Sequence, residues 1–303
     1  MSKNILLTGG SGFIGKKLTA LLINHGYSVS ILSRTERKAS KDITYYKWDL
    51  ENNYIDETSV LKADYIIHLA GEGIAAKKWS NKRKKEIIDS REKPIELIYS
   101  VLNKNNKSLD AFISASAVGI YGAFTSENIC NEETPAANDF LGETCQKWET
   151  ATESIKSLGI RTVIIRTGLV LGKGDGFLKK LTPLFKYGFG SIIGTGKQYM
   201  PWIHIDDLCS IYLLAITNAN MNGPFNAAVT DNTNNAVFSK ALAKVYNHSL
   251  WLPKVPSFVI KLIMGEMSNI VLTGQRVSSQ KIENAGFKFK YSNLEPALIS
   301  FIK

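Results

Sequence analysis

The stretch ILLTGGSGFIG near the N-terminus limits the possible folds of this 303-residue chain more than any other feature. An apolar run at residues 4–8 leads without a break into a glycine-rich turn, and leucine and isoleucine then recur at helical spacing over residues 14–22. Glycines at this spacing allow a tight turn and let backbone N–H groups approach a pyrophosphate at the start of a helix. The order of strand, turn and helix therefore predicts a dinucleotide-binding unit. Its expected cofactor contacts are Gly9, Gly12, Phe13, Ile14 and Gly15.

The first 170 residues alternate short apolar runs with amphipathic segments, which is typical of βαβ units around a parallel sheet. The expected strands are residues 4–8, 28–32, 43–48, 64–70, 111–116 and 161–167. The later part of the chain is richer in glycine, proline and aromatic residues, with a helix-like stretch from Leu208. We therefore predict an α/β protein, a Rossmann-like doubly wound parallel sheet with a smaller C-terminal α/β lobe. The expected domains are residues 1–171, which also receive about 203–228, and a lobe made of 172–202 and 229–303.

Composition narrows the class of protein further. The three cysteines, an odd number without paired spacing, argue against a disulfide framework or a zinc site and favour the cytoplasm. No second histidine has metal-site spacing, so we expect no metal. No apolar run approaches the ~18 residues that would span a bilayer, so we expect no membrane partner.

The formal net charge is +10, and much of the positive charge lies in KKWSNKRKKE, residues 77–86. A solvated helix face is the first interpretation of such a run, and a phosphate-bearing substrate or cofactor is the second. Nucleic acid is the weakest, because no aromatic-interleaved basic sheet or recognition-helix pattern accompanies the run. We therefore expect no nucleic-acid partner.

The end of the second strand indicates which dinucleotide binds. An acidic residue there binds the ribose 2′-hydroxyl of NAD, whereas an arginine accommodates a 2′-phosphate. Here the strand ends with Ser33 and Arg34, with Arg37 and Lys38 close behind and no carboxylate at the switch. The pattern favours NADP(H), although Arg34 as an ordinary surface residue stays the alternative. Further expected contacts follow the third and fourth strands: Asp49, Leu50, Leu69, Ala70 and Gly71.

Several motifs in order resemble the extended short-chain dehydrogenase/reductases of the nucleotide-sugar epimerase type. They are TGGSGFIG, HLAG, SASAVGIYG, RTGLVLG and WIHIDDL. LAGEGIAAKKW, ETCQKWE and the C-terminal VPSFVIKLIMGEMSNIVLTGQRV resemble more closely the YfcH-like epimerase family. The resemblance covers essentially the whole chain and implies an NADP-type Rossmann protein with a small C-terminal lobe. It does not imply a particular reaction.

In the family that the chain resembles, a serine after the fifth strand acts with a Tyr-x-x-x-Lys on the next helix. Ser116 matches the serine, with Ser114 as a second candidate on the same strand face. One register places Phe140 and Thr144 at the tyrosine and lysine positions, and the other places Leu141 and Cys145 there. No Tyr-x-x-x-Lys occurs anywhere in the chain.

Another group must then supply a proton, or none is transferred. Tyr121, just past the strand that carries Ser116, is the first candidate, and a packed loop aromatic is its alternative interpretation. His204 could act near neutral pH, yet it reads first as the residue before a helix that Asp206 or Asp207 caps. Near the cofactor the resemblance places a polar residue, here Arg91. Glu86 and Arg166 are further candidates at that end, whereas Glu72 and Lys77 could face the substrate side.

Two classes of function remain open from the sequence. The first is an NADP(H)-dependent oxidoreductase or epimerase-like enzyme that acts on a small anionic or sugar-like molecule. The second is a protein that binds or senses NADP(H) without turnover, because fold alone does not establish catalysis. A homodimer is one option for its assembly.

Overall fold

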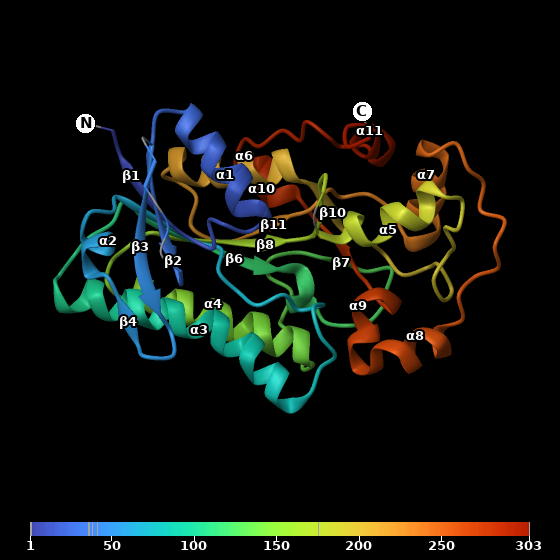
Figure 1. Cartoon of the computed structure of the whole chain (residues 1–303), viewed down its shortest axis with the longest axis horizontal. Helices are drawn as coiled ribbons and strands as arrows, with labels where there is room; N and C mark the ends of the chain where they lie inside the picture. The colour runs from blue at the N-terminus through green and yellow to red at the C-terminus, as the bar shows by residue number, and fades with distance from the viewer. Residues whose placement is uncertain (1, 36, 38, 41, 175, 303) are drawn as a thin grey trace.

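The computed structural model describes the whole chain except Met1, Glu36, Lys38, Lys41, Asp175 and Lys303. Lys38, predicted near the cofactor, therefore lies outside the described residues. An eight-stranded sheet runs through the molecule in the order β11-β8-β6-β5-β1-β2-β3-β4 (Figure 1). Its six predicted strands are β1 Asn4–Thr8, β2 Ser28–Ser33, β3 Ile43–Asp49, β5 Tyr65–His68, β6 Ala111–Ala117 and β8 Thr162–Thr167. The predicted fold class, a Rossmann-like parallel sheet, is confirmed.

Two further strands close the edges of this sheet. β11, Gly223–Ala227, pairs parallel with β8, so that a segment 60 positions downstream joins the last predicted strand. β4, Tyr54–Ile55, pairs antiparallel with β3 at the other edge. Neither was predicted as a strand, since both are short and lack a long β-branched run.

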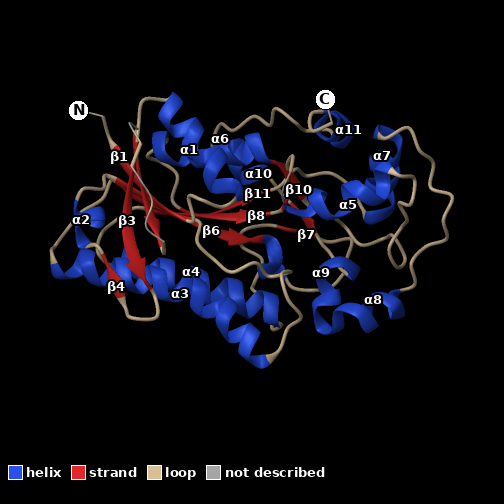
Figure 2. Cartoon of the chain, in the orientation of Figure 1, coloured by secondary structure: helices blue, strands red, loops and turns tan. Residues whose placement is uncertain are grey.

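Helices cover both faces of the sheet, as Figures 1 and 2 show. On one face lie α1 Phe13–Asn24, α6 Ile205–Thr217 and α10 Gln280–Asn284; on the other lie α2 Glu57–Leu61, α3 Asn81–Lys104 and α4 Phe140–Lys156. Each layer buries its own apolar cluster, around Leu7 and Leu18 on the α1 side and around Phe112 and Ile98 on the α3 side. Ligand sites in such sheets lie beyond the carboxyl ends of the strands.

The C-terminal part adds short elements beside the end of β6 and β8. Strands β9 Leu169–Leu171 and β10 Trp202–His204 pair with each other, as do β7 Ile129–Cys130 and β12 Arg276–Val277. The helices are α5 Gly176–Lys186, α7 Asn235–Val245, α8 Ser257–Met264, α9 Asn269–Leu272 and α11 Leu294–Ile299, with 3-10 turns at Val118–Tyr121 and Gly265–Ser268. A third apolar cluster, which includes Trp202 and Phe238, lies among them. The predicted domain boundaries stay predictions. Within the described residues, no helix is long and apolar enough to span a membrane.

The start of α6 corrects one prediction. His204, and neither Asp206 nor Asp207, caps this helix: its Nδ1 accepts a hydrogen bond from the Asp206 backbone N–H at 3.0 Å. Asp207 is buried and instead accepts backbone hydrogen bonds from Lys290 and Tyr291 in the C-terminal segment. The prediction was wrong because it took the aspartates for local caps, whereas one of them holds a distant segment.

Candidate functional site

The glycine-rich turn forms a cradle at the end of β1. The Gly12 N–H donates to the Gly9 carbonyl at 3.0 Å, and a Cβ at Gly15 would overlap that same carbonyl oxygen. Gly9 has a φ of +69°, and a Cβ there would stand 2.9 Å from the Ala70 nitrogen. Only glycine suits such a backbone approach. The structure thus brings Gly9 directly against Leu69 and Ala70, as expected if the predicted contacts from β1 and β5 belong to one nucleotide site.

The first turn of α1 is suited to an anion. Gly12 is the N-cap without a side-chain hydrogen bond, and the turn after it, with Phe13 and Ile14, contains no acidic residue. Helix N-terminal N–H groups without partners favour phosphate oxygens through hydrogen bonding and the helix dipole. The chain therefore fits a dinucleotide pyrophosphate at this point.

Beneath the cradle, Thr8 and His68 form a buried pair on β1 and β5. The Thr8 hydroxyl accepts hydrogen bonds from the Leu69 and Ala70 backbone N–H groups, both at 3.1 Å, and lies 2.8 Å from His68 Nδ1. Because the hydroxyl oxygen already accepts twice, we assign its proton to the bond with Nδ1. Burial lowers the pKa of His68 to about 3, so the ring is neutral and supports the Leu69–Ala70 backbone beside the glycine turn.

Beside Arg34, just after β2, lies a carboxylate that the sequence analysis did not expect there. The Arg34 side chain is 75% exposed, and its Nη1 lies 3.7 Å from the Glu72 Oε1. Ser33, beside it, donates from its hydroxyl to the Thr35 carbonyl at 2.8 Å. β2 itself contains no acidic residue, and Glu36, two positions after Arg34, lies outside the described residues. In space, however, the loop after β5 supplies Glu72, although β1 separates β5 from β2 in the sheet, and no pattern in the sequence indicates this contact.

Glu72 is held firmly by α3. Its backbone N–H donates to the Ser90 hydroxyl at 2.9 Å, its carbonyl accepts from Arg91 at 3.1 Å, and its carboxylate pairs with Arg83 at 3.1 Å. Arg83 is only 7% exposed and also pairs with Glu86 at 3.1 Å. Arg91 and Glu86 thus position the loop that carries Gly71 and Glu72.

The basic run at residues 77–86 is therefore only partly a solvated helix face. Arg83 is buried in the ion pairs just described, and Lys84 forms a 2.7 Å ion pair with Glu266 in the C-terminal part. Lys85 pairs with Asp89 at 2.8 Å along the helix. The first interpretation was incomplete because ion pairs with residues distant in sequence are not visible in a charge run.

Asp49 and Leu50, two of the predicted cofactor contacts, lie at the carboxyl end of β3 and directly after it. Asp49 accepts hydrogen bonds from Asn52 and from the Glu51 backbone, and the Asn52 side chain foremost holds the pKa of Asp49 below its usual range. Leu50 packs against the apolar cluster on the α3 side. Asp49 thus shapes a turn, and its carboxylate is already engaged there.

At the end of β6, Ser116 takes part in a buried ionic network. Its hydroxyl donates to Glu149 Oε1 of α4 at 2.7 Å. Arg166 of β8 grips both oxygens of Glu149 at 2.9 and 2.8 Å, with side chains only 7% and 12% exposed. Ser114, two residues earlier and fully buried, bonds the Ala115 carbonyl at 2.9 Å. Arg166, predicted as a cofactor contact, is thus an ion-pair partner of Glu149. The sequence analysis did not identify Glu149 as a member of the site.

Tyr121 belongs to the same network. Its hydroxyl donates to Asn226 Oδ1 at 2.7 Å and accepts from Arg166 Nη1 at 3.1 Å. The ring is 1% exposed, and burial raises the pKa of Tyr121 to about 12. A tyrosine that gives up its proton near neutral pH needs the opposite shift. The packed-aromatic interpretation fits these contacts better than the proton-donor one.

The positions that the family gives to tyrosine and lysine contain other groups. Phe140 packs edge-on against Trp79 at 4.6 Å between ring centres, and Lys84 Nζ lies 5.1 Å from the same ring. The Thr144 hydroxyl donates to the Phe140 carbonyl at 2.6 Å. Cys145 is buried, which raises the pKa of its thiol to about 12. In neither register does the helix offer a proton donor near neutral pH.

His204 also lies away from this network. Its ring stacks on Tyr291 and Phe301, with ring centres 3.7 and 4.6 Å away, and Nε2 lies 3.1 Å from the Ser300 hydroxyl. Burial lowers the pKa of His204 to about 4. Among the residues that the structure describes, no group of three or more histidine, cysteine or acidic side chains could hold a metal ion.

A doubly wound parallel sheet with a glycine cradle at the start of α1 defines a dinucleotide-binding protein. Residues 5–228 match the NAD dependent epimerase/dehydratase family, and residues 255–300 match a domain of unknown function, DUF1731. The chain belongs to the NAD dependent epimerase/dehydratase family.

Relatives are similar over nearly their full length. Epimerase family protein YfhF of Bacillus subtilis is 36% identical over 99% of this chain and 98% of its own. The SDR39U1 homologue of Arabidopsis thaliana, described as chloroplastic, is 33% identical over 97% of this chain and 85% of its own.

Solved structures agree in fold. Human epimerase family protein SDR39U1, crystallised with NADPH, superposes with a TM-score of 0.85 at 28% identity and covers 98% of both chains. UDP-glucose 4-epimerase of Thermotoga maritima has a TM-score of 0.79 over 99% of this chain and 97% of its own. Its identity is 20%, so it shows the fold alone.

Proposed function

We propose that this chain binds NADP(H) in the cradle at the start of α1 and acts as an oxidoreductase or epimerase-like enzyme without the tyrosine–lysine pair. The observation that carries the proposal is the open first turn of α1 with Arg34 at the end of β2. The glycine cradle would hold the pyrophosphate, and Arg34 with Ser33 would face the 2′-phosphate. The human relative crystallised with NADPH supports the choice of cofactor.

The bound cofactor would supply hydride transfer, which does not itself require a protein acid. The residues of this chain would bind and orient the cofactor and the substrate, and they would exclude water from the site. The Ser116 hydroxyl already gives its proton to Glu149, so its oxygen can only accept a hydrogen bond. Ser116 would therefore orient a substrate group that donates, such as a hydroxyl, and a small sugar-like or anionic molecule is the proposed substrate class.

Further proposals concern the cellular location and the binding partners of the protein. A cytoplasmic location is supported by three cysteines that are all free and buried. Nucleic acid is not proposed as a partner, because the basic run engages acidic side chains of the chain itself. A homodimer stays a prediction.

The second candidate is an NADP(H)-binding protein without turnover. The mutual pairing of Ser116, Glu149, Arg166 and Tyr121 favours it, because no member of this set is free to exchange a proton with a substrate.

One labelling experiment separates the two functions. Purified protein is mixed with stereospecifically deuterated NADPH and a metabolite extract, and products are searched for deuterium by mass spectrometry. An enzyme yields a labelled product that disappears in a variant unable to bind NADPH. NADPH binding without any labelled product would support the sensor, after a stereochemical assay has tested for an epimerase that retains its hydride.

A further inference from the structure

Helix α8 carries apolar side chains on the outside of the molecule. Six of its eight residues, SFVIKLIM, are apolar, yet none is buried. Phe258, Leu262 and Ile263 are 71%, 79% and 59% exposed. Phe258 and Leu262 lie four positions apart and are therefore neighbours on the helix surface. An ordinary surface helix turns such side chains toward the core, so this exposed face indicates an interaction site.

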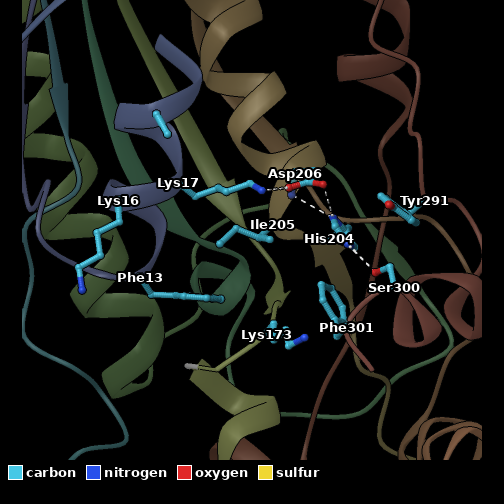
Figure 3. Close-up of a pocket in the computed structure, with 11 residues that line it drawn as sticks. Phe13, Lys16, Lys17, Lys173, His204, Ile205, Asp206, Tyr291, Ser300 and Phe301 are labelled. Atoms are coloured by element: carbon cyan, nitrogen blue, oxygen red, sulfur yellow. Dashed lines mark hydrogen bonds and ion pairs between the residues drawn. The ribbon is translucent and has the colours of Figure 1, made fainter. Parts of the chain in front are cut away.

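The end of the chain shows the usual arrangement of large apolar side chains. Tyr291 and Phe301 stack on the buried ring of His204, as Figure 3 shows. The exposure at α8 is thus a property of this helix and not of the whole C-terminal part.

The position of α8 is fixed by contacts on both of its sides. Before the helix, the Val255 N–H donates to the Ile192 carbonyl and the Gly194 N–H donates to the Val255 carbonyl, both at 2.8 Å. After the helix, Glu266 forms a 2.7 Å ion pair with Lys84 of α3. The body of the protein therefore holds α8 with its apolar face toward solvent.

The charge around α8 is positive. Hydrogen bonds join residues 186–197 to residues 250–264, and these two segments contain four lysines and no aspartate or glutamate. The lysines are all exposed, and within the part of the chain that the structure describes none of them forms an ion pair: Lys186, Lys197, Lys254 and Lys261. Trp251, in the second segment, is also exposed. The surface thus combines apolar and aromatic side chains with uncompensated positive charge.

We propose that the outer face of α8 docks on an anionic membrane surface. Phe258, Leu262 and Ile263 enter the interfacial layer of the lipid, and the four lysines lie toward the headgroups. Apolar burial and attraction to anionic lipids both strengthen the binding of such a helix. Trp251 suits this layer, where tryptophan is enriched. The expectation of no membrane partner rested on the lack of a bilayer-spanning run, which an interfacial helix does not need.

A second copy of the chain fits this face less well than a lipid surface does. In a two-fold symmetric contact the patch would meet itself, so its lysines would face lysines without an acidic partner. Each copy also has a formal net charge of +10, which opposes association. Anionic headgroups instead supply the missing negative charge.

Co-sedimentation of the full-length protein with lipid vesicles tests the proposal. Vesicles of phosphatidylcholine are compared with vesicles in which about a third of the lipid is phosphatidylglycerol. We expect at least about tenfold tighter binding to the anionic vesicles, with an affinity that falls as the salt concentration rises. No binding to either kind of vesicle, or equal binding to both, would overturn the proposal.

Apolar variants locate the contact. Phe258→Ser with Leu262→Ser should weaken vesicle binding at least about tenfold, because two apolar side chains no longer leave water. Tyr54→Ser with Leu61→Ser removes two exposed apolar side chains at the other end of the molecule and should leave binding unchanged (Figure 1). Thermal unfolding checks that each variant is folded. Unchanged binding of the α8 variant would overturn the proposal.

The contribution of charge is tested in the same way. Lys254→Gln with Lys261→Gln should weaken binding to the anionic vesicles about tenfold or more. Lys62→Gln with Lys147→Gln, two exposed lysines outside this surface, makes the same charge change and should have much less effect. Light scattering on the same proteins tests for the second copy: a dimer that only the α8 variant dissociates would assign the face to self-association and overturn the proposal.

Discussion

The glycine turn at the end of β1 and the network at the end of β6 are built in opposite ways. At the nucleotide end, the first turn of α1 has no side-chain cap and no acidic residue, and glycines keep the approach to it open. At the end of β6, in contrast, Ser116, Glu149, Arg166, Tyr121 and Asn226 satisfy one another. Unpaired donors are what a binding site needs, while a proton relay needs a group that is free to change partners. The first end therefore has the features expected of a cofactor site, while the second lacks the tyrosine–lysine pair that the resemblance led us to expect.

The largest expected effect tests whether the β6 end is structural. Glu149→Ala leaves Arg166 buried without its carboxylate, which should cost about 3–5 kcal/mol of the free energy of unfolding. The matched control is Glu153→Ala on the same helix, whose exposed pair with Lys156 should contribute less than about 1 kcal/mol. Chemical denaturation measures both. A loss of only a few tenths of a kcal/mol at Glu149 would show that the network does not hold α4 to β8.

The nucleotide end should show a pH dependence through His68. Its pKa is about 6.5 in the unfolded chain and about 3 when buried, so the unfolded state binds the additional proton first. The neutral ring makes its full contribution to the free energy of unfolding above pH 6.5. This contribution is lost as the pH falls, by about 3 kcal/mol at pH 4. His68→Asn, which keeps an acceptor for Thr8, should remove this part of the slope when denaturation is followed from pH 7 to pH 4. An unchanged slope would contradict the assignment.

Gly12→Asp separates stability from cofactor binding. Aspartate is a favourable N-cap and the backbone of Gly12 is extended, but its Cβ would lie 3.2 Å from the Gly9 carbonyl oxygen, so the melting temperature should change little. Its carboxylate would occupy the place of the pyrophosphate, so the affinity for NADPH should fall about 100-fold or more. Gly12→Ala, which adds a methyl group without charge, is the control and should lose much less affinity for NADPH. Fluorescence titration with NADPH, beside thermal unfolding, decides the outcome.

Arg34 and Glu72 should act in opposite directions on cofactor choice. Arg34→Ala should lower the affinity for NADPH about tenfold relative to NADH, because a 2′-phosphate loses its cation. Glu72→Gln removes the carboxylate that competes for Arg34, so the preference for NADPH should rise several-fold. Glu96→Gln, an exposed position farther along α3, makes the same charge change and should alter neither affinity. The same direction of change in both variants would exclude competition between phosphate and Glu72.

The sequence predicts best what is determined locally. The strands and the cradle follow from short apolar runs and glycine spacing. Contacts between distant segments were not accessible in this way. Glu72 comes to Arg34 from another strand, Arg166 reaches Glu149 across the sheet layer, and Asp207 binds a segment more than 80 residues away. Each depends on the tertiary fold, and no local pattern indicates such a partner.

The most direct test of the account is a fluorescence titration of the purified protein with NADPH and with NADH. Saturable binding that is tighter for NADPH, and that Gly12→Asp weakens about 100-fold or more without loss of folding, is the predicted result. No saturable binding of either cofactor by the folded protein would contradict the account, because the open cradle at α1 would then not be a cofactor site.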